Sequence, residues 1–336
     1  DIDPRMLNTN SPQLIDNDSL NGRIDHQLST KDTLTARHAF LTQEVKAFQL
    51  IKGQNPDTST KSHVSNLTWN RAWSPNTITS FAIGFERFRT LIVPERNNLG
   101  PQIFISGVLT PINAQNAIPI NRTENRFRYS GNWRQVRGRH QFTAGFSVVR
   151  RQLNGYEGDS HLGAIQFNNN LGNDAPTNLR LGIPVYYYIS LAVKPLTRGF
   201  RNWDNFAYAG DTWQLNQKLT FSYGVNYRPN SKPTEVNNLN DVGYYSDRNN
   251  FGPTAGFAYR AKLGVIRAAY GLHYGEIFPV TFQSIRFNAP NNVKLVIPDP
   301  DPLNPLGNIP SDVSKAGRTV LYAFAKDLAT PYAHQY

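Results

Sequence analysis

Few residues in this sequence stand in spacings that support catalysis or metal binding. No two of its seven histidines are four residues apart, and the HExxH motif of zinc proteases does not occur. The GxSxG motif of serine hydrolases and the phosphate-binding P-loop are also missing. Cysteine is absent, which excludes disulfide bonds and thiolate metal sites. We therefore predict a protein without enzymatic activity or cofactor, with no metal at His26, His38, His63, His140, His161, His273 or His334.

One pair of carboxylates has a spacing that suits a hard cation. Asp299 and Asp301 lie in the segment IPDPDP and could offer oxygen ligands to Ca²⁺. The prolines on both sides more simply indicate a stiff, extended loop. The sequence leaves both interpretations open.

Strands are expected to position these residues, because apolar and polar residues alternate with period two along most of the chain. The segment from Leu219 to Tyr227 places apolar or aromatic residues at every second position and small or polar residues between them. The segment from Val265 to Gly275 has the same pattern. Such alternation predicts strands with one apolar and one polar face. About ten segments of this kind occur along the chain, beginning with Ser19–Thr30 and Thr33–Glu44.

The links between these segments alternate strictly between short and long. Short turns fall near residues 31, 75, 138, 215 and 263, and long loops span 45–62, 91–121, 154–198, 229–249 and 275–330. An up-and-down barrel of the outer-membrane type has short turns at one end and long loops at the other. Trp69, Trp73, Trp133 and Trp213 lie near short turns, as expected of an aromatic girdle at the membrane interface. Arg71 on the same face counts against a girdle unless its side chain reaches towards water.

The composition is compatible with such a barrel. The 336 residues are only 39% hydrophobic, with 12% aromatic residues and a mean hydropathy of −0.50. The net charge of +11 could indicate nucleic-acid binding, but the basic residues are spread along alternating strands and form no single patch. We therefore predict no nucleic-acid partner. Solvated faces, or attraction to anionic lipid headgroups at a barrel rim, explain the charge.

Several segments resemble the barrel of TonB-dependent outer-membrane receptors, in particular the Oar-like branch that carries a carboxypeptidase-regulatory-like domain. The matching segments are LNGRIDHQLSTKDTLTARHAF (Leu20–Phe40), the strand pairs Phe206–Pro229 and Asn250–Phe278, TFQSIRFNAP (Thr281–Pro290) and TPYAHQY (Thr330–Tyr336). The resemblance implies a bacterial outer-membrane protein that binds a ligand and takes it up by a gated mechanism. It also implies a plug domain and a TonB-type energy-coupling partner, neither of which is recognisable in this sequence.

The family barrel has 22 strands, so we expect this chain to form an incomplete barrel. Residues 1–19 are expected to be irregular and residues 20–336 to form the partial barrel, with unpaired edges at Leu20–Thr30 and Thr330–Tyr336. If the first and last strands paired instead, the chain would be a small porin-like barrel that conducts passively. A structural or adhesive surface protein and a soluble β-sandwich are the remaining alternatives.

The alternation also predicts which residues a ligand would meet. Phe221, Tyr223, Val225, Ile266, Tyr270 and Leu272 are expected to face lipid, and Ser222, Gly224 and Asn226 to face the lumen. The lumen-facing candidates for binding an anionic substrate or plug carboxylates are Arg126, Arg128, Arg134, Arg267 and His273. Aromatic residues in the long loops could stack on a glycan or peptide, or fold over the barrel mouth; they are Tyr186, Tyr187, Tyr188, Tyr244 and Tyr245. Outer-membrane lipid and lipopolysaccharide are the expected surroundings.

Overall fold

The fold is a single large antiparallel sheet that carries a smaller sheet at one end. The structure is a computed structural model, and it describes residues 13–46, 56–94, 100–107, 111–307 and 321–336. Eleven strands follow one another across the large sheet, and a twelfth, β12 (Thr234–Glu235), pairs with β10. The eleven are β1 (Leu14–Gln27), β2 (Asp32–Lys46), β3 (Pro56–Ser74), β4 (Thr77–Pro94), β6 (Ile120–Arg137), β7 (His140–Glu157), β10 (Arg198–Gln214), β11 (Leu219–Tyr227), β13 (Phe251–Ala261), β14 (Gly264–Tyr274) and β16 (Tyr332–Gln335).

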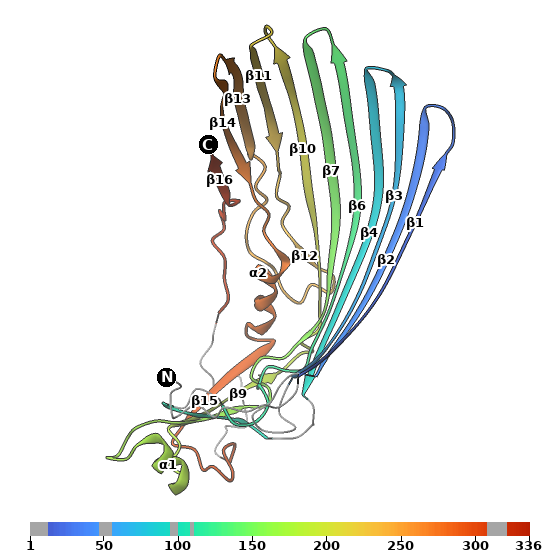
Figure 1. Ribbon diagram of the computed structural model, residues 1–336. Helices are drawn as coiled ribbons and strands as arrows, with labels where there is room; N and C mark the ends of the chain where they lie inside the picture. The colour runs from blue at the N-terminus through green and yellow to red at the C-terminus, as the bar shows by residue number, and fades with distance from the viewer. Residues whose placement is uncertain (1–12, 47–55, 95–99, 108–110, 308–320) are drawn as a thin grey trace.

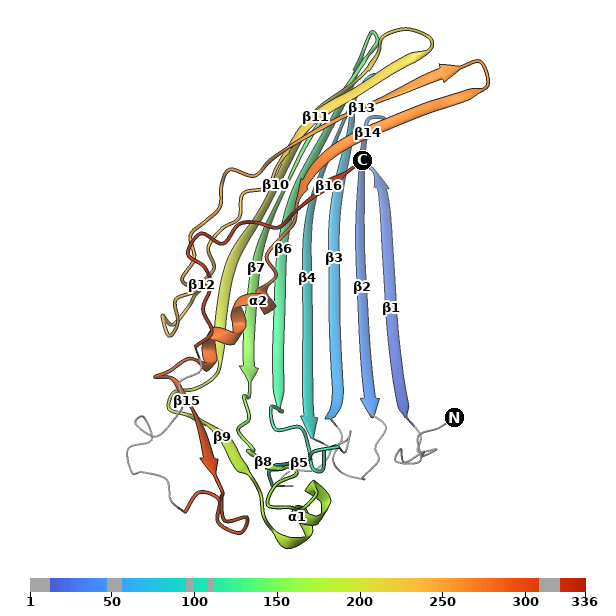
Figure 2. The ribbon, with the colours of Figure 1, turned by 90° about the vertical axis from the view of Figure 1, so that its left-hand side faces the viewer.

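The large sheet curves into an arc that does not close (Figure 1). Among the described residues, β1 pairs with β2 alone and β16 with β14 alone, so the first and last strands do not meet. The short turns all lie at one end of the arc and the long connections at the other (Figure 2). This arrangement confirms the prediction of an open, up-and-down barrel segment. The described strands do not form the closed barrel of about ten strands that was the alternative.

Several predicted boundaries were wrong. β1 begins at Leu14, so residues 14–19 belong to the sheet, and residues 1–12 of the segment expected to be irregular lie outside the described ranges. β3 begins at Pro56, within the segment predicted as a loop from 45 to 62. Polar residues there, such as Thr58 and Ser59, carry no apolar alternation, yet they pair with β2 and β4 beyond the apolar band. The tail segment forms the short strand β16 at Tyr332–Gln335, which confirms the edge expected at Thr330–Tyr336.

The register separates the two predicted sets of side chains onto opposite faces, because directly paired residues share a face. Phe221 pairs with Phe257, and Tyr223 pairs through Ala255 with Tyr270. These residues form one apolar face, which carries most of the large exposed hydrophobic side chains of the sheet. Ser222, Gly224, Asn226, Arg267 and His273 lie on the other face.

The polar face is the inside of the arc. There, α2 (Pro279–Gln283) and the 3₁₀ helix η1 (Ser284–Phe287) fold back from the end of β14 (Figure 1). Phe282 and Ile285 pack against Leu153 of β7 and Phe200 of β10, with Val242 and Tyr244 completing the cluster. In the part of the chain that the structure describes, no helix is long and apolar enough to cross a membrane.

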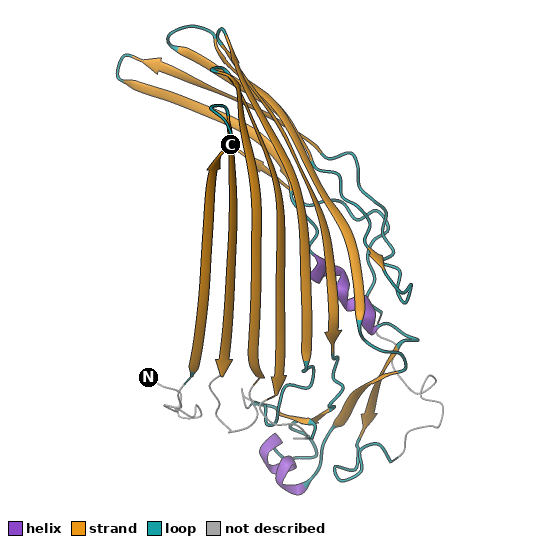
Figure 3. Cartoon of the chain, turned by 90° about the vertical axis from the view of Figure 1, so that its right-hand side faces the viewer, coloured by secondary structure: helices purple, strands orange, loops and turns teal. Residues whose placement is uncertain are grey.

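The second sheet lies beyond the loop end of the arc and is built from three of the long connections (Figure 3). Its strands are β5 (Gln102–Ile105), β8 (Ala164–Phe167), β9 (Tyr186–Ala192) and β15 (Asn292–Pro298), in the order β15-β9-β8-β5. It has its own apolar cluster, centred on Phe167, Tyr187 and Leu295. The helix α1 (Ala175–Leu181) adjoins it, with Asp174 accepting a hydrogen bond from the Thr177 amide as N-cap and Gly182 ending the helix at a φ of 67°.

Candidate functional site

The candidate site is the inward, polar face of the large sheet, because that face lines the space inside the arc. All five lumen candidates lie on it: Arg126, Arg128, Arg134, Arg267 and His273. They do not form one cluster. Arg126 and Arg128 lie well along β6, whereas Arg134 and Arg267 lie near the short turns.

Arg126 and Arg128 are compensated by carboxylates of the same chain. Arg126 Nε donates to Glu124 Oε1 at 2.8 Å, and its Nη1 lies 3.8 Å from Glu86 Oε2. Arg128 Nη2 lies 3.6 Å from Glu86 Oε1. These two arginines therefore already have anionic partners. The pairing of Arg126 with Glu124 is local to β6, whereas the contacts of both arginines with Glu86 depend on the register of β4 against β6, which the sequence does not reveal.

A second charged cluster, which the sequence did not predict, lies closer to the loop end. Arg151 of β7 and Arg228, just after β11, both bind Asp204 of β10 and Glu276, just after β14. The Arg228 Nη2 atom lies 3.0 Å from Asp204 Oδ1 and 3.3 Å from Glu276 Oε2. The Arg151 side chain is only 5% exposed, so a missing partner there would leave a buried charge uncompensated. This four-residue cluster fastens the start of the α2 segment to the inner wall.

Arg134 and Arg267 have a different environment. The Arg134 guanidinium donates to Gln141 Oε1 at 2.7 Å, a neutral partner. Within the described ranges, neither arginine forms a salt bridge, and both side chains are exposed. Arg260 of β13 lies on the same face and in the row next to Arg267. The turn end of the inner wall is therefore a zone of uncompensated positive charge.

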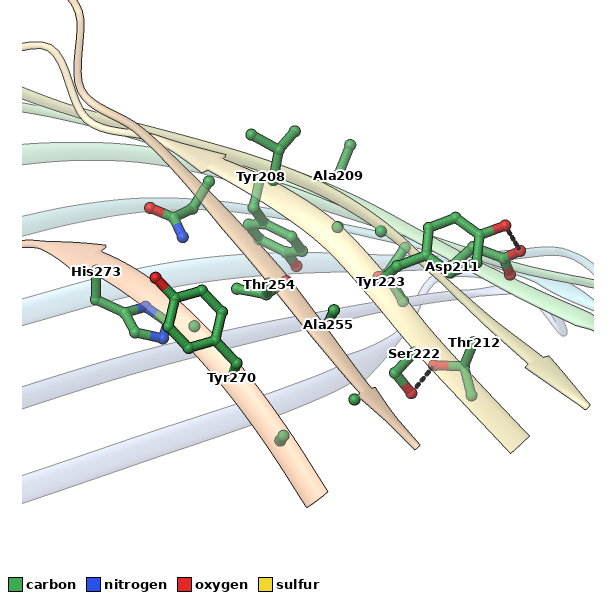
Figure 4. Close-up of a pocket in the computed structure, with 18 of the residues that line it drawn as sticks. Tyr208, Ala209, Asp211, Thr212, Ser222, Tyr223, Thr254, Ala255, Tyr270 and His273 are labelled. Atoms are coloured by element: carbon green, nitrogen blue, oxygen red, sulfur yellow. Dashed lines mark hydrogen bonds between the residues drawn. The ribbon is translucent and has the colours of Figure 1, made fainter. Parts of the chain in front are cut away.

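Between these zones the inner wall is hollowed by small residues. Gly210, Gly224 and Gly271 share one row with Thr254, and a hollow of about 590 Å³ lies along it. A Cβ atom at Gly224 would lie 2.7 Å from the Ala209 carbonyl oxygen and 3.0 Å from Gly210 Cα, so the close approach of β10 and β11 requires glycine. Figure 4 shows the side chains around this hollow, including Tyr208 and His273.

The five loop tyrosines are divided between packing and exposed positions. Tyr187 is 4% exposed in the core of the second sheet, and Tyr244 is 2% exposed beside Phe282. Burial raises the pKa of the Tyr244 hydroxyl to about 12. Tyr186 and Tyr188 are half-buried, and only Tyr245 is fully available, at 68% exposure. Stacking on a ligand by Tyr187 and Tyr244 would require the loops to rearrange, because both rings fill apolar clusters.

The aspartates at 299 and 301 form a turn in this structure. Asp301 Oδ1 accepts a hydrogen bond from the Leu303 amide at 2.9 Å, and Asp299 has a φ of 43°. No group of three or more potential metal ligands occurs among the residues that the structure describes.

The outward face has the layout of a surface that meets lipid. Trp69, Trp133 and Trp213 lie on it near the short turns, and Trp73 donates its indole N–H to Thr79 of the same face. Arg71, a charged residue within the girdle, lies 3.3 Å from Asp32 and stacks over the Trp73 ring at 4.3 Å. A second aromatic row follows farther from the turns and includes Phe40, Phe85, Phe127, Tyr227, Phe251 and Tyr274.

The sequence profile of the outer membrane beta barrel domain family matches residues 4–242 and 236–336, which together cover nearly the whole chain. The chain belongs to this family. A comparison with curated proteins found no match.

Membership of this family places the barrel domain in the bacterial outer membrane. Its two faces follow from that location, because the apolar face of such a barrel meets hydrocarbon and the polar face lines the lumen.

Proposed function

We propose that this barrel domain is the wall of a gated transporter of the TonB-dependent receptor type, of the Oar-like branch. Ligand would bind at the loop end and pass along the inner wall when an energised partner moves a plug domain. The mechanism is binding and gating, without covalent chemistry. The plug and the energy-coupling protein would be partners outside this chain.

The observation that carries the proposal is the uncompensated positive charge at the turn end of the inner wall. Arg134, Arg260 and Arg267 face the lumen, and none forms a salt bridge within the described ranges. Short turns lie on the periplasmic side in barrels of this class. Carboxylates of a plug, or an anionic ligand leaving the barrel, would compensate these arginines, and a wall that serves only as an anchor has no need of them.

Cysteine accessibility tests the gating mechanism, because the chain has no cysteine of its own. In the complete protein in intact cells, Arg267→Cys would be probed with a membrane-impermeant maleimide added outside. Energised cells should label this position faster than cells treated with a protonophore, because only an energised partner opens the lumen. Tyr270→Cys is the matched control, since it lies three residues along β14 on the lipid-facing side and should stay unlabelled in both states.

Equal labelling of Arg267→Cys with and without energy would rule out gated transport. Fast labelling in both states would indicate a permanently open, passive pore. Absence of labelling in both states would favour an anchor with a permanently blocked lumen. The flanking reading frame gives an independent check, because a plug domain and a TonB box must precede the barrel in a transporter of this type.

A second candidate function is a structural or adhesive surface protein whose barrel anchors its loops. The second sheet favours this alternative, because three long loops combine into one folded unit with its own apolar cluster. Asp159 joins two strands of that unit by accepting a hydrogen bond from Ser190 at 2.8 Å and lying 3.3 Å from Lys294 Nζ. Loss of cell attachment on deletion of the loops, with uptake unaffected, would support it.

A further inference from the structure

A row of basic side chains lies on the outward face, beginning level with Phe127 of the second aromatic row and continuing beyond it. We propose that it binds phosphorylated lipid headgroups of the outer leaflet. The row consists of Lys61 of β3, Arg87 and Arg89 of β4, Arg150 of β7 and Arg201 of β10, and is called the outer basic row here. The inference does not depend on the transport proposal, because it concerns the opposite face of the sheet.

The register places these cations on the lipid side of the wall. Phe85 pairs with Phe127, and Phe127 pairs with Arg150, so Arg150 shares the face of the aromatic row. Arg87 and Arg89 follow Phe85 at alternate positions of β4, which keeps them on that face. Their side chains are exposed.

Their depth fits the headgroup layer. Arg89 is the thirteenth residue of β4, which begins at Thr77 beside a short turn. A tilted strand crosses the hydrocarbon in about 9–11 residues. Arg89 and its neighbours therefore lie where the hydrocarbon ends on the side of the long loops, and that is the side of the outer leaflet.

The cations lie beside one another on the outward face, with Glu44 as a carboxylate diagonal to Lys61 and outside salt-bridge distance of it. Lys61 is the direct cross-strand partner of Arg89, and like charges in this arrangement destabilise a sheet. Arg87 lies in the adjacent row opposite His63. Among the described residues, no member of the outer basic row forms a salt bridge. Arg87 donates to the Asn125 side-chain oxygen at 3.2 Å and Arg201 to the Phe200 carbonyl oxygen at 2.9 Å, and both acceptors are neutral.

An aromatic ring holds one of the cations in place for a headgroup. The Arg150 Cζ atom lies 4.9 Å from the centre of the Trp203 ring, and Trp203 is itself 41% exposed and directly paired with Arg150. An indole beside a guanidinium is suited to the membrane interface, because the ring contacts acyl chains and the cation contacts phosphate. The acyl chains would lie on the apolar face directly below, so one lipid could use both surfaces.

Retention of defined lipids by the full-length protein in detergent tests the proposal. The probes are diphosphoryl lipid A, monophosphoryl lipid A and phosphatidylcholine, measured by native mass spectrometry. Wild-type protein should retain diphosphoryl lipid A best and phosphatidylcholine least. The double variant Lys61→Gln/Arg89→Gln should bind diphosphoryl lipid A about thirtyfold more weakly, because each basic side chain at an anionic membrane surface contributes a factor of about five.

Arg37→Gln is the matched control, because Arg37 is an exposed arginine on the inward face of the neighbouring strand β2. It should leave the affinity for diphosphoryl lipid A unchanged. Equal retention of all three lipids by the wild type would overturn the proposal, and so would equal weakening by Arg37→Gln and the double variant. If the double variant does not fold, the preference of the wild-type protein among the three lipids decides alone.

Discussion

The ring of Tyr208 on β10 covers Gly145, its direct partner on β7. A Cβ atom at Gly145 would lie 2.6 Å from Tyr208 Cε1. The hydroxyl of Tyr208 continues past Gly145 and donates to Asn132 Oδ1 of β6 at 3.0 Å. One side chain therefore spans three strands of the inner wall, and the missing side chain at position 145 makes this possible.

The first prediction concerns this contact. Gly145→Val should destabilise the barrel by about 1–3 kcal/mol, because the new side chain would displace the ring and also approach the Gly131 carbonyl oxygen, 2.9 Å from the Cβ position. Urea unfolding of the complete protein in detergent measures the effect. Gly22→Ala is the control, since nothing lies within 4 Å of its Cβ position. A Gly145→Val protein as stable as the control variant would contradict the packing described.

The second prediction concerns the two faces. Val225→Arg should cost about 2–4 kcal/mol in free energy of unfolding if position 225 lies near the middle of the membrane. Ser222→Arg, on the opposite face of the same strand, should change the stability by about 0.5 kcal/mol or less. The comparison is made by unfolding both proteins from lipid vesicles. A greater loss for Ser222→Arg would reverse the assignment of lumen and lipid.

The third prediction concerns the charged cluster at the start of the α2 segment. Glu276→Gln removes the charge that Arg151 and Arg228 share, and hydrogen bonds to charged groups contribute about 1.5–3 kcal/mol. Amide exchange in residues 276–298 should therefore accelerate on the order of tenfold or more. Lys232→Gln breaks a pair with Asp241 whose carboxylate side chain is 73% exposed, and should not change this exchange. Unchanged protection in Glu276→Gln would show that apolar packing alone holds the segment.

The fourth prediction concerns alkaline pH. The pKa of Tyr244 is raised to about 12 by burial, whereas an unfolded tyrosine titrates near 10. Above pH 10 the unfolded state therefore binds fewer protons than the folded state, so stability is fully present below pH 10 and falls as the pH rises towards 12. The urea midpoint of wild-type protein should fall more steeply between pH 10 and 11.5 than that of Tyr244→Phe. Parallel curves would show that Tyr244 ionises without cost.

The fifth prediction concerns topology. Tyr245→Cys should react with an impermeant maleimide on intact cells, because Tyr245 is 68% exposed at the loop end. Leu263→Cys lies in the turn between β13 and β14 and should react only after the outer membrane is permeabilised. Added protease should likewise cut the long loops and spare the turn at 137–139. Labelling of Leu263→Cys on intact cells would invert the orientation.

The order of the strands was predictable because each strand carries a complete local signal. Leu219–Tyr227 alternates without a break, and the short links bring adjacent strands together without further information. The ends of the strands were less predictable. Thr58 and Ser59 extend β3 through backbone pairing outside the apolar band, where no hydrophobic pattern is required.

The site was only partly predictable, because its chemistry depends on which strands face one another. Alternation placed Arg126 on the polar face, but its pairing with Glu86 requires the register between β4 and β6. Asp204 of β10 and Glu276, just after β14, both contact Arg151, although the three residues are far apart in the sequence. Tyr187 and Tyr244 carry no periodic pattern, so their burial followed only from the folding of the loops.

The length of β4 determines how far the long loops stand from the hydrocarbon. β4 has 18 residues, and at about 3.3 Å per residue it is roughly 60 Å long. With a tilt of about 40° it rises some 45 Å, while the apolar band of such barrels is about 25 Å tall. The wall therefore continues roughly 20 Å past the hydrocarbon, as a collar around the mouth. Long loops lie on the outer side in barrels of this class. In that orientation the second sheet stands on this collar above the phosphates of the outer leaflet, within reach of large molecules outside the cell.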